Sequence, residues 1–179
     1  AKLLHLANSV YYNPSGAAVR GLPEAVTRLG VSLVRTTALA VAMNQLMRSR
    51  EMVVYSDLMR DLWQHSIKTA VAARILARAH TRLNPDEAML AGLVHDLGAF
   101  YMLYRAMQYA ELRARPESMR YLIVQWHESI GVTLLNALGL PTEIVDATID
   151  HDQPRPVPTT LRTLADVVYV ANLLTSQNF

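Results

Sequence analysis

The chain places a histidine directly before an aspartate at the end of an apolar helical segment. Residues 87–99 read Glu-Ala-Met-Leu-Ala-Gly-Leu-Val-His-Asp-Leu-Gly-Ala. Asn84 is a candidate N-cap for this helix, Pro85 suits its first turn, and Gly98 is expected to end it in a left-handed conformation. Burying an imidazole and a carboxylate is costly unless both are paired, and one divalent cation can pair both. The segment therefore predicts a helical fold built around a polar site.

Helical spacing of apolar residues extends along the rest of the chain. It predicts helices over residues 2–8, 23–30, 31–48, 56–79, 116–138 and 141–150. A last helix is expected to begin after a cap at Thr159 or Thr160. The apolar residues of 31–48 are spread so evenly that we expect that helix to be buried on most sides. Because the sequence has no β-alternation and no internal repeat, the predicted fold class is all-α, a multi-helix bundle.

Length and composition fit one domain. The 179 residues, of which 51% are hydrophobic, can bury a sizeable core, and we expect a single domain with lobes of about 1–50 and 51–179. The first residues already follow a helical pattern, so the N-terminus is expected to be truncated. Cysteine is absent, so a metal site must use histidines and carboxylates. No apolar run reaches the length of a membrane span and no signal peptide is recognisable, so a cytoplasmic protein without membrane association is expected.

Charge is distributed unevenly along the chain. Residues 1–82 hold 11 Lys and Arg against 4 Asp and Glu, and residues 83–179 hold 6 against 11, so the halves carry about +7 and −5. A basic half can attract nucleic acid. Its basic residues are scattered along helices, however, and no aromatic residues alternate with them to stack on bases. Solvated helix faces are the favoured interpretation, and nucleic acid is not expected as a partner.

Four segments of the chain together resemble a known family. Gly-Leu-Val-His95-Asp96-Leu-Gly resembles the signature of the HD superfamily, metal-dependent phosphohydrolases named for the adjacent His and Asp. Leu-Ala-Asn8-Ser-Val-Tyr-Tyr, the segment 21–30 and Leu-Trp-Gln-His65-Ser precede it in an order that resembles the HDOD family (HD-related output domain). The resemblance covers nearly the whole chain and implies an HD-domain-like helical fold.

The resemblance also implies a set of metal ligands. The related HD-GYP phosphodiesterases, which cleave cyclic di-GMP, have a long series of such ligands. By this resemblance Asp61 stands one turn before the first histidine of the series, and Asp152 replaces a later histidine. The implied ligands are Asp61, His65, His95, Asp96, His127, His151 and Asp152. Imidazole and carboxylate ligands suit iron, manganese or zinc.

One position departs from the pattern of the HD enzymes. They close the site with an aspartate on the last helix, where this chain has Val-Tyr-Val-Ala-Asn172-Leu-Leu. A neutral amide binds a divalent ion more weakly than a carboxylate and cannot act as a base. Asp166 lies about 120° away around that helix and is a poor substitute. The Gly-Tyr-Pro segment of the HD-GYP proteins is also missing.

The resemblance therefore implies a regulatory or output module of a bacterial signal-transduction protein. Its expected partners are other signalling proteins or fused receiver, GGDEF or EAL-type domains. A metal-dependent phosphohydrolase that acts on a cyclic dinucleotide or another nucleotide is the alternative. Water would then be the nucleophile, and Lys68, one turn after His65, would bind phosphate. A nucleotide sensor that binds without cleaving is a third possibility.

Each histidine of the series also has an ordinary structural explanation. His65 follows Trp63 on an apolar helix and could be a core histidine. His95 and Asp96 could lie at a helix C-terminus with an internal hydrogen bond, and His127 could form an exposed ion pair with Glu128. His151 and Asp152 could be ordinary loop residues. Taken together, four of the six histidines at HD positions favour a shared polar cluster. His5 and His80 match no motif and are expected at the surface.

Overall fold

The computed structural model describes residues 2–14, 16–47 and 50–176, and these residues form helices and loops without any strand. The all-α prediction is confirmed. The helices are α1 (Lys2–Ala7), α2 (Leu22–Leu29), α3 (Val31–Met47), the 3₁₀ helix η1 (Arg50–Tyr55), α4 (Ser56–His80), α5 (Pro85–Val94), α6 (Leu97–Ala106), α7 (Ala110–Arg113), α8 (Pro116–Ala137), α9 (Thr142–Asp146) and α10 (Leu164–Thr175).

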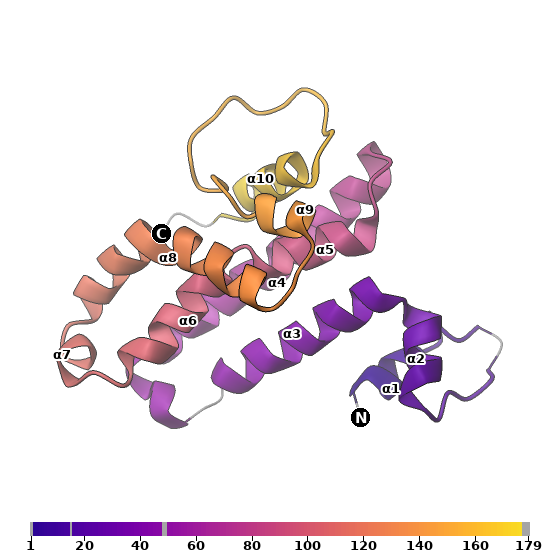
Figure 1. Ribbon diagram of the computed structural model, residues 1–179, viewed down its shortest axis with the longest axis horizontal. Helices are drawn as coiled ribbons and strands as arrows, with labels where there is room; N and C mark the ends of the chain where they lie inside the picture. Colours follow the sequence, from indigo (N-terminus) through magenta and orange to yellow (C-terminus); the bar gives the residue numbers. More distant parts are fainter. Residues whose placement is uncertain (1, 15, 48–49, 177–179) are drawn as a thin grey trace.

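The buried apolar residues form two clusters. The small cluster joins α1, α2 and the start of α3, and consists of Ala7, Val19, Ala25, Leu29 and Leu33. The large one is built from α4, α5, α6, α8, α9 and α10, and α3 reaches it through Met43. α3 thus runs from the small lobe, beside α1 and α2, along the large bundle (Figure 1). The transition between the two cores falls within this helix.

The side chain of Asn8 holds the small lobe together. Its Oδ1 accepts a hydrogen bond from the Val19 N–H at 2.7 Å, and its Nδ2 donates to the Val19 carbonyl at 2.8 Å. With these two bonds the Asn8 side chain pairs with the Val19 backbone and joins the end of α1 to the loop that leads to α2. The segment around Asn8 therefore has a structural role, in the lobe that does not carry the site.

The prediction that residues 31–48 are buried on most sides is wrong for the residues that the structure describes. Within α3, the buried residues are Leu33, Thr36 and Met43. The helix packs against α1, α2, α4 and α5, and its other residues are half-buried or exposed. Small residues such as Ala38 and Ala42 occupy exposed positions, because alanine favours helix formation even where nothing covers it. The prediction rested on larger apolar residues, of which Val34, Leu39, Val41 and Leu46 are only half-buried, so an even apolar spread overstates burial.

Asn84 caps α5 as predicted, because its side chain accepts a hydrogen bond from the Asp86 N–H at 2.9 Å. The predicted left-handed cap at Gly98 is wrong. α5 ends at Val94, and Gly98 is the second residue of α6. A Cβ on Gly98 would overlap the carbonyl oxygen of His127 on α8. This glycine is required for the close approach of two helices and not for a change of chain direction.

The predicted cap of the last helix is also wrong. Thr163 caps α10, and neither Thr159 nor Thr160 does. The Thr163 hydroxyl accepts from the Asp166 N–H at 3.1 Å, while the Asp166 carboxylate accepts from the Thr163 N–H at 3.0 Å. This reciprocal pair is a capping box. The Pro-rich stretch is therefore part of an irregular loop that continues to residue 163.

No single helix in the described part of the chain is both long enough and apolar enough to cross a membrane. By length and composition alone, α2 and α3 would meet the requirement together, although they meet at an angle of 113°.

Candidate metal centre

Side chains from four segments of the large bundle converge at one point. The cluster comprises His65 from α4, His95 and Asp96 from the α5–α6 junction, His127 from α8, and His151 and Asp152 from the turns after α9. All are buried except Asp152, whose side chain is 54% exposed. Their ligand atoms form two groups, each with all atoms within 4.8 Å of one another, and Asp96 belongs to both groups.

The two oxygens of Asp96 face different histidines. Oδ2 lies 3.2 Å from Nε2 of His95 and 3.8 Å from Nε2 of His65. Oδ1 lies 3.2 Å from Nε2 of His151 and 3.6 Å from Nε2 of His127. We call His65, His95 and Oδ2 of Asp96 the sealed half, and His127, His151, Asp152 and Oδ1 of Asp96 the open half. A bridging carboxylate of this kind can serve two cations at once.

Backbone carbonyls fix the protonation of three histidines. In each, Nδ1 lies at hydrogen-bond distance from a backbone carbonyl oxygen three or four residues earlier. The distance is 2.8 Å from His95 to the Gly92 oxygen, 2.8 Å from His127 to the Ile123 oxygen and 2.7 Å from His151 to the Thr148 oxygen. A carbonyl oxygen only accepts, so each Nδ1 must carry the hydrogen. In the neutral ring, Nε2 then directs its lone pair into the cluster. Metal-binding histidines are oriented in this way.

The short distances between Nε2 atoms call for a proton or a metal ion between them. His127 and His151 have their Nε2 atoms 3.3 Å apart, and those of His65 and His95 are 3.1 Å apart. In the open half both rings are protonated at Nδ1, so two lone pairs would repel unless a proton or a metal ion lies between them. The donor set therefore fits a divalent ion of the type that imidazole and carboxylate bind.

The two halves differ in electrostatics. Burial lowers the pKa of His65, and the neighbouring His95 adds to this effect. Burial also disfavours protonated His151, but the hydrogen bond and charge of Asp96, together with the charge of Asp152, outweigh it and raise the pKa to about 9. The same carboxylates raise the pKa of His127. The open half therefore attracts positive charge more strongly than the sealed half.

Both aspartates are held in the ionised form. Burial alone would raise the pKa of Asp96, but His95 and His151 bring it well below its usual value. Burial acts on Asp152 in the same direction, and the hydrogen bond from His127 and the charge of His151 bring its pKa to about 2. Two carboxylates in their anionic form are therefore available to a cation.

Asn172 lies on α10 beside the open half and is buried. Its Nδ2 donates to the His151 carbonyl at 3.1 Å and to Oδ1 of Asp152 at 2.8 Å. Both partners are acceptors, so the amide nitrogen must point towards them. Asn172 therefore positions Asp152 as a hydrogen-bond donor. Asp166 belongs to the capping box at the start of α10 and does not replace the missing carboxylate.

Residues 1–154 match the HDOD domain family. The chain belongs to the HDOD family. Comparison with curated proteins gives no match. The similar solved structures include a putative metal-dependent phosphohydrolase from Shewanella amazonensis SB2B, 29% identical with a TM-score of 0.71, and an HDOD domain protein with unknown function from Geobacter sulfurreducens, 25% identical with a TM-score of 0.57. Both matches cover 97% of this chain, but 63% and 60% of the longer proteins.

The MmoQ response regulator from Methylococcus capsulatus str. Bath has the same fold. It is 21% identical, with a TM-score of 0.54, and the match covers 97% of this chain and 71% of that one. The similarity at this level of identity concerns the helical architecture alone. The family match and the Shewanella and Geobacter relatives place the chain among HD-related helical proteins.

Two residues predicted for the site lie elsewhere in the HDOD domain. Asp61 and Lys68 are exposed on α4, and Asp61 belongs to neither group of candidate ligands. The buried stripe of α4 includes Leu62, His65 and Thr69, and both charged residues lie beside this stripe. Spacing of three or four residues from His65 does not bring them to the cluster. His5 and His80 are exposed, as predicted.

Glu128 supports the open half from α8. Its Oε2 accepts a hydrogen bond from the Asp150 N–H at 2.9 Å. Asp150 has φ +56°, a left-handed conformation that is unfavourable for most side chains. Glu128, which directly follows His127 on α8, thus stabilises the turn that carries His151. Sequence reasoning considered Glu128 only as an ion-pair partner of His127.

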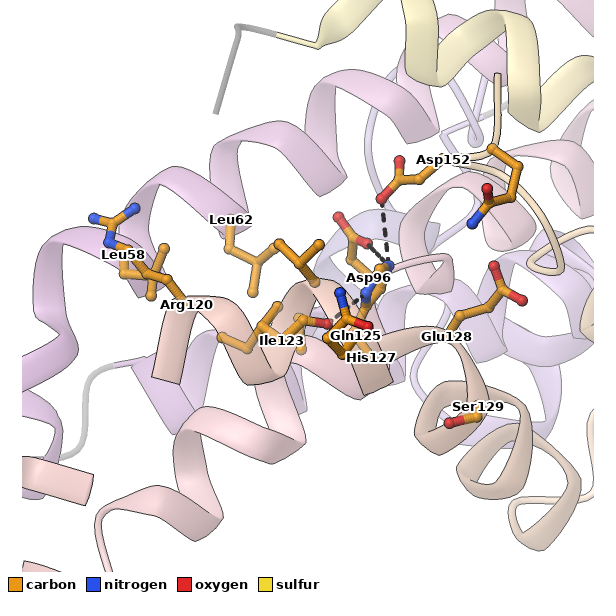
Figure 2. Close-up of a pocket in the computed structure, with 13 residues that line it drawn as sticks. Leu58, Leu62, Asp96, Arg120, Ile123, Gln125, His127, Glu128, Ser129 and Asp152 are labelled. Atoms are coloured by element: carbon orange, nitrogen blue, oxygen red, sulfur yellow. Dashed lines mark hydrogen bonds and ion pairs between the residues drawn. The ribbon is translucent and has the colours of Figure 1, made fainter. Parts of the chain in front are cut away.

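A cleft of about 510 Å³ opens onto the cluster (Figure 2). Asp96, His127 and Asp152 line it at the cluster, and Arg120 lies further along it beside Leu58. A cavity of this size suits a small-molecule ligand. No sequence motif pointed to Arg120, although its position seven residues before His127 places both on one side of a helix.

Proposed function

We propose that this HDOD domain is a regulatory module of a signal-transduction protein and that its cluster holds a divalent metal without efficient hydrolysis. Asn172 carries this proposal. The position that would supply a further anionic ligand supplies a hydrogen-bond donor to Asp152. The anionic ligands near the metal are therefore Asp96 and Asp152. HDOD membership supports the signalling role, with receiver, GGDEF or EAL-type domains or other signalling proteins as partners.

The chain's own residues prepare the site for a cation. His95, His127 and His151 would bind through Nε2, because each Nδ1 is engaged by a backbone carbonyl. Asp96 would bridge the two halves. A bound divalent ion of iron, manganese or zinc supplies Lewis-acid polarisation of an oxygen ligand. Asn172 and Glu128 keep Asp152 and the His151 turn in place, so the geometry exists before binding.

A metal-dependent phosphohydrolase is the second candidate. The cleft favours it, because a substrate there would reach Asp96, His127 and Asp152. The name of the Shewanella relative supports the same chemistry. In this case Arg120, and not Lys68, is the basic residue available to bind phosphate, since Arg120 lines the cleft and Lys68 does not. A cyclic dinucleotide or another nucleotide would be the substrate class.

Metal content and turnover, measured together, distinguish the two candidates. Untagged protein is analysed for iron, manganese and zinc before and after chelation, and is assayed with Mn²⁺ on cyclic di-GMP and bis(p-nitrophenyl) phosphate. The regulatory proposal expects bound metal, its loss in His95→Ala, and no significant turnover. Wild-type turnover that disappears in His95→Ala would establish the hydrolase instead.

Asn172→Asp provides the complementary test. Turnover that appears only in this variant would show that the single amide accounts for the inactivity, as the regulatory proposal requires. If neither wild type nor Asn172→Asp retains metal, the metal part of the proposal is wrong and the cluster is a protonated polar network. Asp166→Asn on the same helix serves as the control, because its carboxylate lies in the capping box and not in the cluster.

A further inference from the structure

The walls of the cleft are two helix faces in register. On α4, Leu58 and Leu62 are four residues apart, so they share one side of the helix. On α8, Arg120 and His127 are seven residues apart and also share one side. α8 thus places a histidine of the cluster at one end of the cleft and an arginine two turns away, while α4 supplies apolar side chains opposite.

The middle of the cleft is apolar. Leu62 comes from α4, and Ile123 and Val124 come from α8, one turn before His127. Val124 is 71% exposed although it is apolar, so it forms the open rim of the cleft. An apolar stretch between two polar ends is typical of pockets that bury the body of a ligand and orient it by its charged groups.

Arg120 forms the far end. Figure 2 shows it beside Leu58, away from Asp96 and Asp152. Its Nε lies 3.9 Å from Oε1 of Glu117, but the two side chains are 50% and 89% exposed, so this pair is weak. Seven residues of helix place Arg120 about 10 Å from His127 along α8. The guanidinium is therefore available to a group on a ligand that reaches from the cluster.

We propose that the cleft binds an elongated organic anion with an acidic group at each end of an apolar or aromatic body. One acidic group meets the cluster, the body lies between Leu62 and the Ile123–Val124 rim, and the second acidic group pairs with Arg120. The proposal rests on the proposed function for its first contact. Asp96 and Asp152 would repel an anion unless a metal ion neutralises them. Arg120 adds a contact that is independent of the metal.

Two rigid probes test this arrangement. Biphenyl-4,4′-diyl bis(phosphate) carries a phosphate at each end of an aromatic body, and biphenyl-4-yl phosphate carries only one. Binding of each to the Mn²⁺-loaded chain is measured by titration calorimetry. The bis(phosphate) is expected to bind about fivefold more tightly, and Arg120→Gln is expected to remove this advantage and leave the monophosphate unchanged. Arg115→Gln, an exposed arginine outside the cleft, is the matched control.

A second variant tests the apolar middle. Val124→Asp places a charge on the exposed rim, where folding is not at risk, and is expected to weaken both probes about tenfold. The proposal is overturned if Arg120→Gln weakens both probes equally or neither, or if Val124→Asp has no effect. If chelation still abolishes monophosphate binding in that case, the metal site stands without the ligand. If chelation affects neither probe, the metal site and the ligand both fail.

Discussion

The sealed and open halves of the cluster use the same residue types under different conditions. His65 and His95 are enclosed and share a single carboxylate oxygen of Asp96. His127 and His151 have that residue's other oxygen and also Asp152, which borders the cleft. The pKa of His65 is lowered, while that of His151 is raised to about 9. Buried histidines next to two carboxylates thus favour positive charge, whereas His65, which has only one carboxylate oxygen nearby, disfavours it.

Each half also depends on a different close contact between helices. In the sealed half, a Cβ on Gly92 would lie 2.9 Å from the Thr69 carbonyl oxygen, so this glycine lets α5 approach α4. In the open half, Gly98 lets α6 approach the backbone of His127. The two halves are therefore positioned by separate packing contacts, and Asp96 is the residue that they share. Substitutions that affect only one half should therefore leave metal binding by the other half unchanged.

The largest effect is expected at that shared residue. Asp96→Asn keeps the shape but removes the charge that faces four histidines. Breaking a buried ion pair costs about 3–5 kcal/mol, so the free energy of unfolding should fall by that order and metal should be lost from both halves. Urea unfolding in the presence of chelator and elemental analysis measure the two effects. Asp146→Asn, an exposed residue on α9, is the control. Undiminished metal content in Asp96→Asn would refute the bridging role.

Gly98→Ala should be nearly as damaging, and only to the open half. The added Cβ overlaps a backbone oxygen, which cannot move without shifting α8, and we expect a loss of about 3 kcal/mol. Gly131→Ala is the matched control at the same helix contact, because its Cβ would lie 3.4 Å from the nearest atom. Thermal unfolding and metal content are the measurements. Equal effects of both substitutions would show that the close approach is not needed.

The sequence predicted most helix boundaries because local residues mark them. Pro85 and Pro116 begin helices, and Gly30 follows the end of α2. Gly98 was misinterpreted, because a glycine that ends a helix and a glycine that admits another helix look alike in sequence. The difference depends on α8, about thirty residues away. The cap at Thr163 was visible as Thr-Leu-Ala-Asp166, a capping-box pattern that outweighs the earlier threonines.

The sequence predicted most residues that form the site, but not how they are arranged. Family resemblance named His65, His95, Asp96, His127, His151 and Asp152, and the structure brings them together. The same resemblance also named Asp61, because a matching position one turn before His65 does not report whether the side chain is buried. The division into two halves and the donor role of Asn172 depend on atom-level contacts between α10 and the turn after α9. No sequence pattern shows such contacts.

Asp152→Asn should affect the open half alone, and more mildly. The amide oxygen can still accept from Asn172, so the loop should stay in place while one negative charge is lost. We expect the metal affinity of the open half to fall about tenfold, or about 1.4 kcal/mol. His65→Gln is the counterpart in the sealed half. Metal is first removed from each variant with a chelator, and the metal-free protein is then titrated with Zn²⁺. A different binding step should be weakened in each variant. If both variants weaken the same step, the cluster is one site.

The smallest effect is expected for Asp166→Asn, because this substitution weakens α10 without changing a residue of either half. Burial opposes ionisation of Asp166, but hydrogen bonds from the Arg162 and Thr163 N–H groups lower its pKa below the usual value. A lowered folded-state pKa stabilises the protein above the unfolded pKa, and this contribution is lost as pH falls through the folded value. The variant should therefore be about 0.5–1 kcal/mol less stable at pH 7, and the difference should shrink below about pH 4. Urea unfolding at both pH values measures this, and metal content at pH 7 should equal that of the wild type. If the metal content changes instead, α10 supports the open half along its whole length. Metal binding there then depends on helix packing as well as on the charges of the ligands.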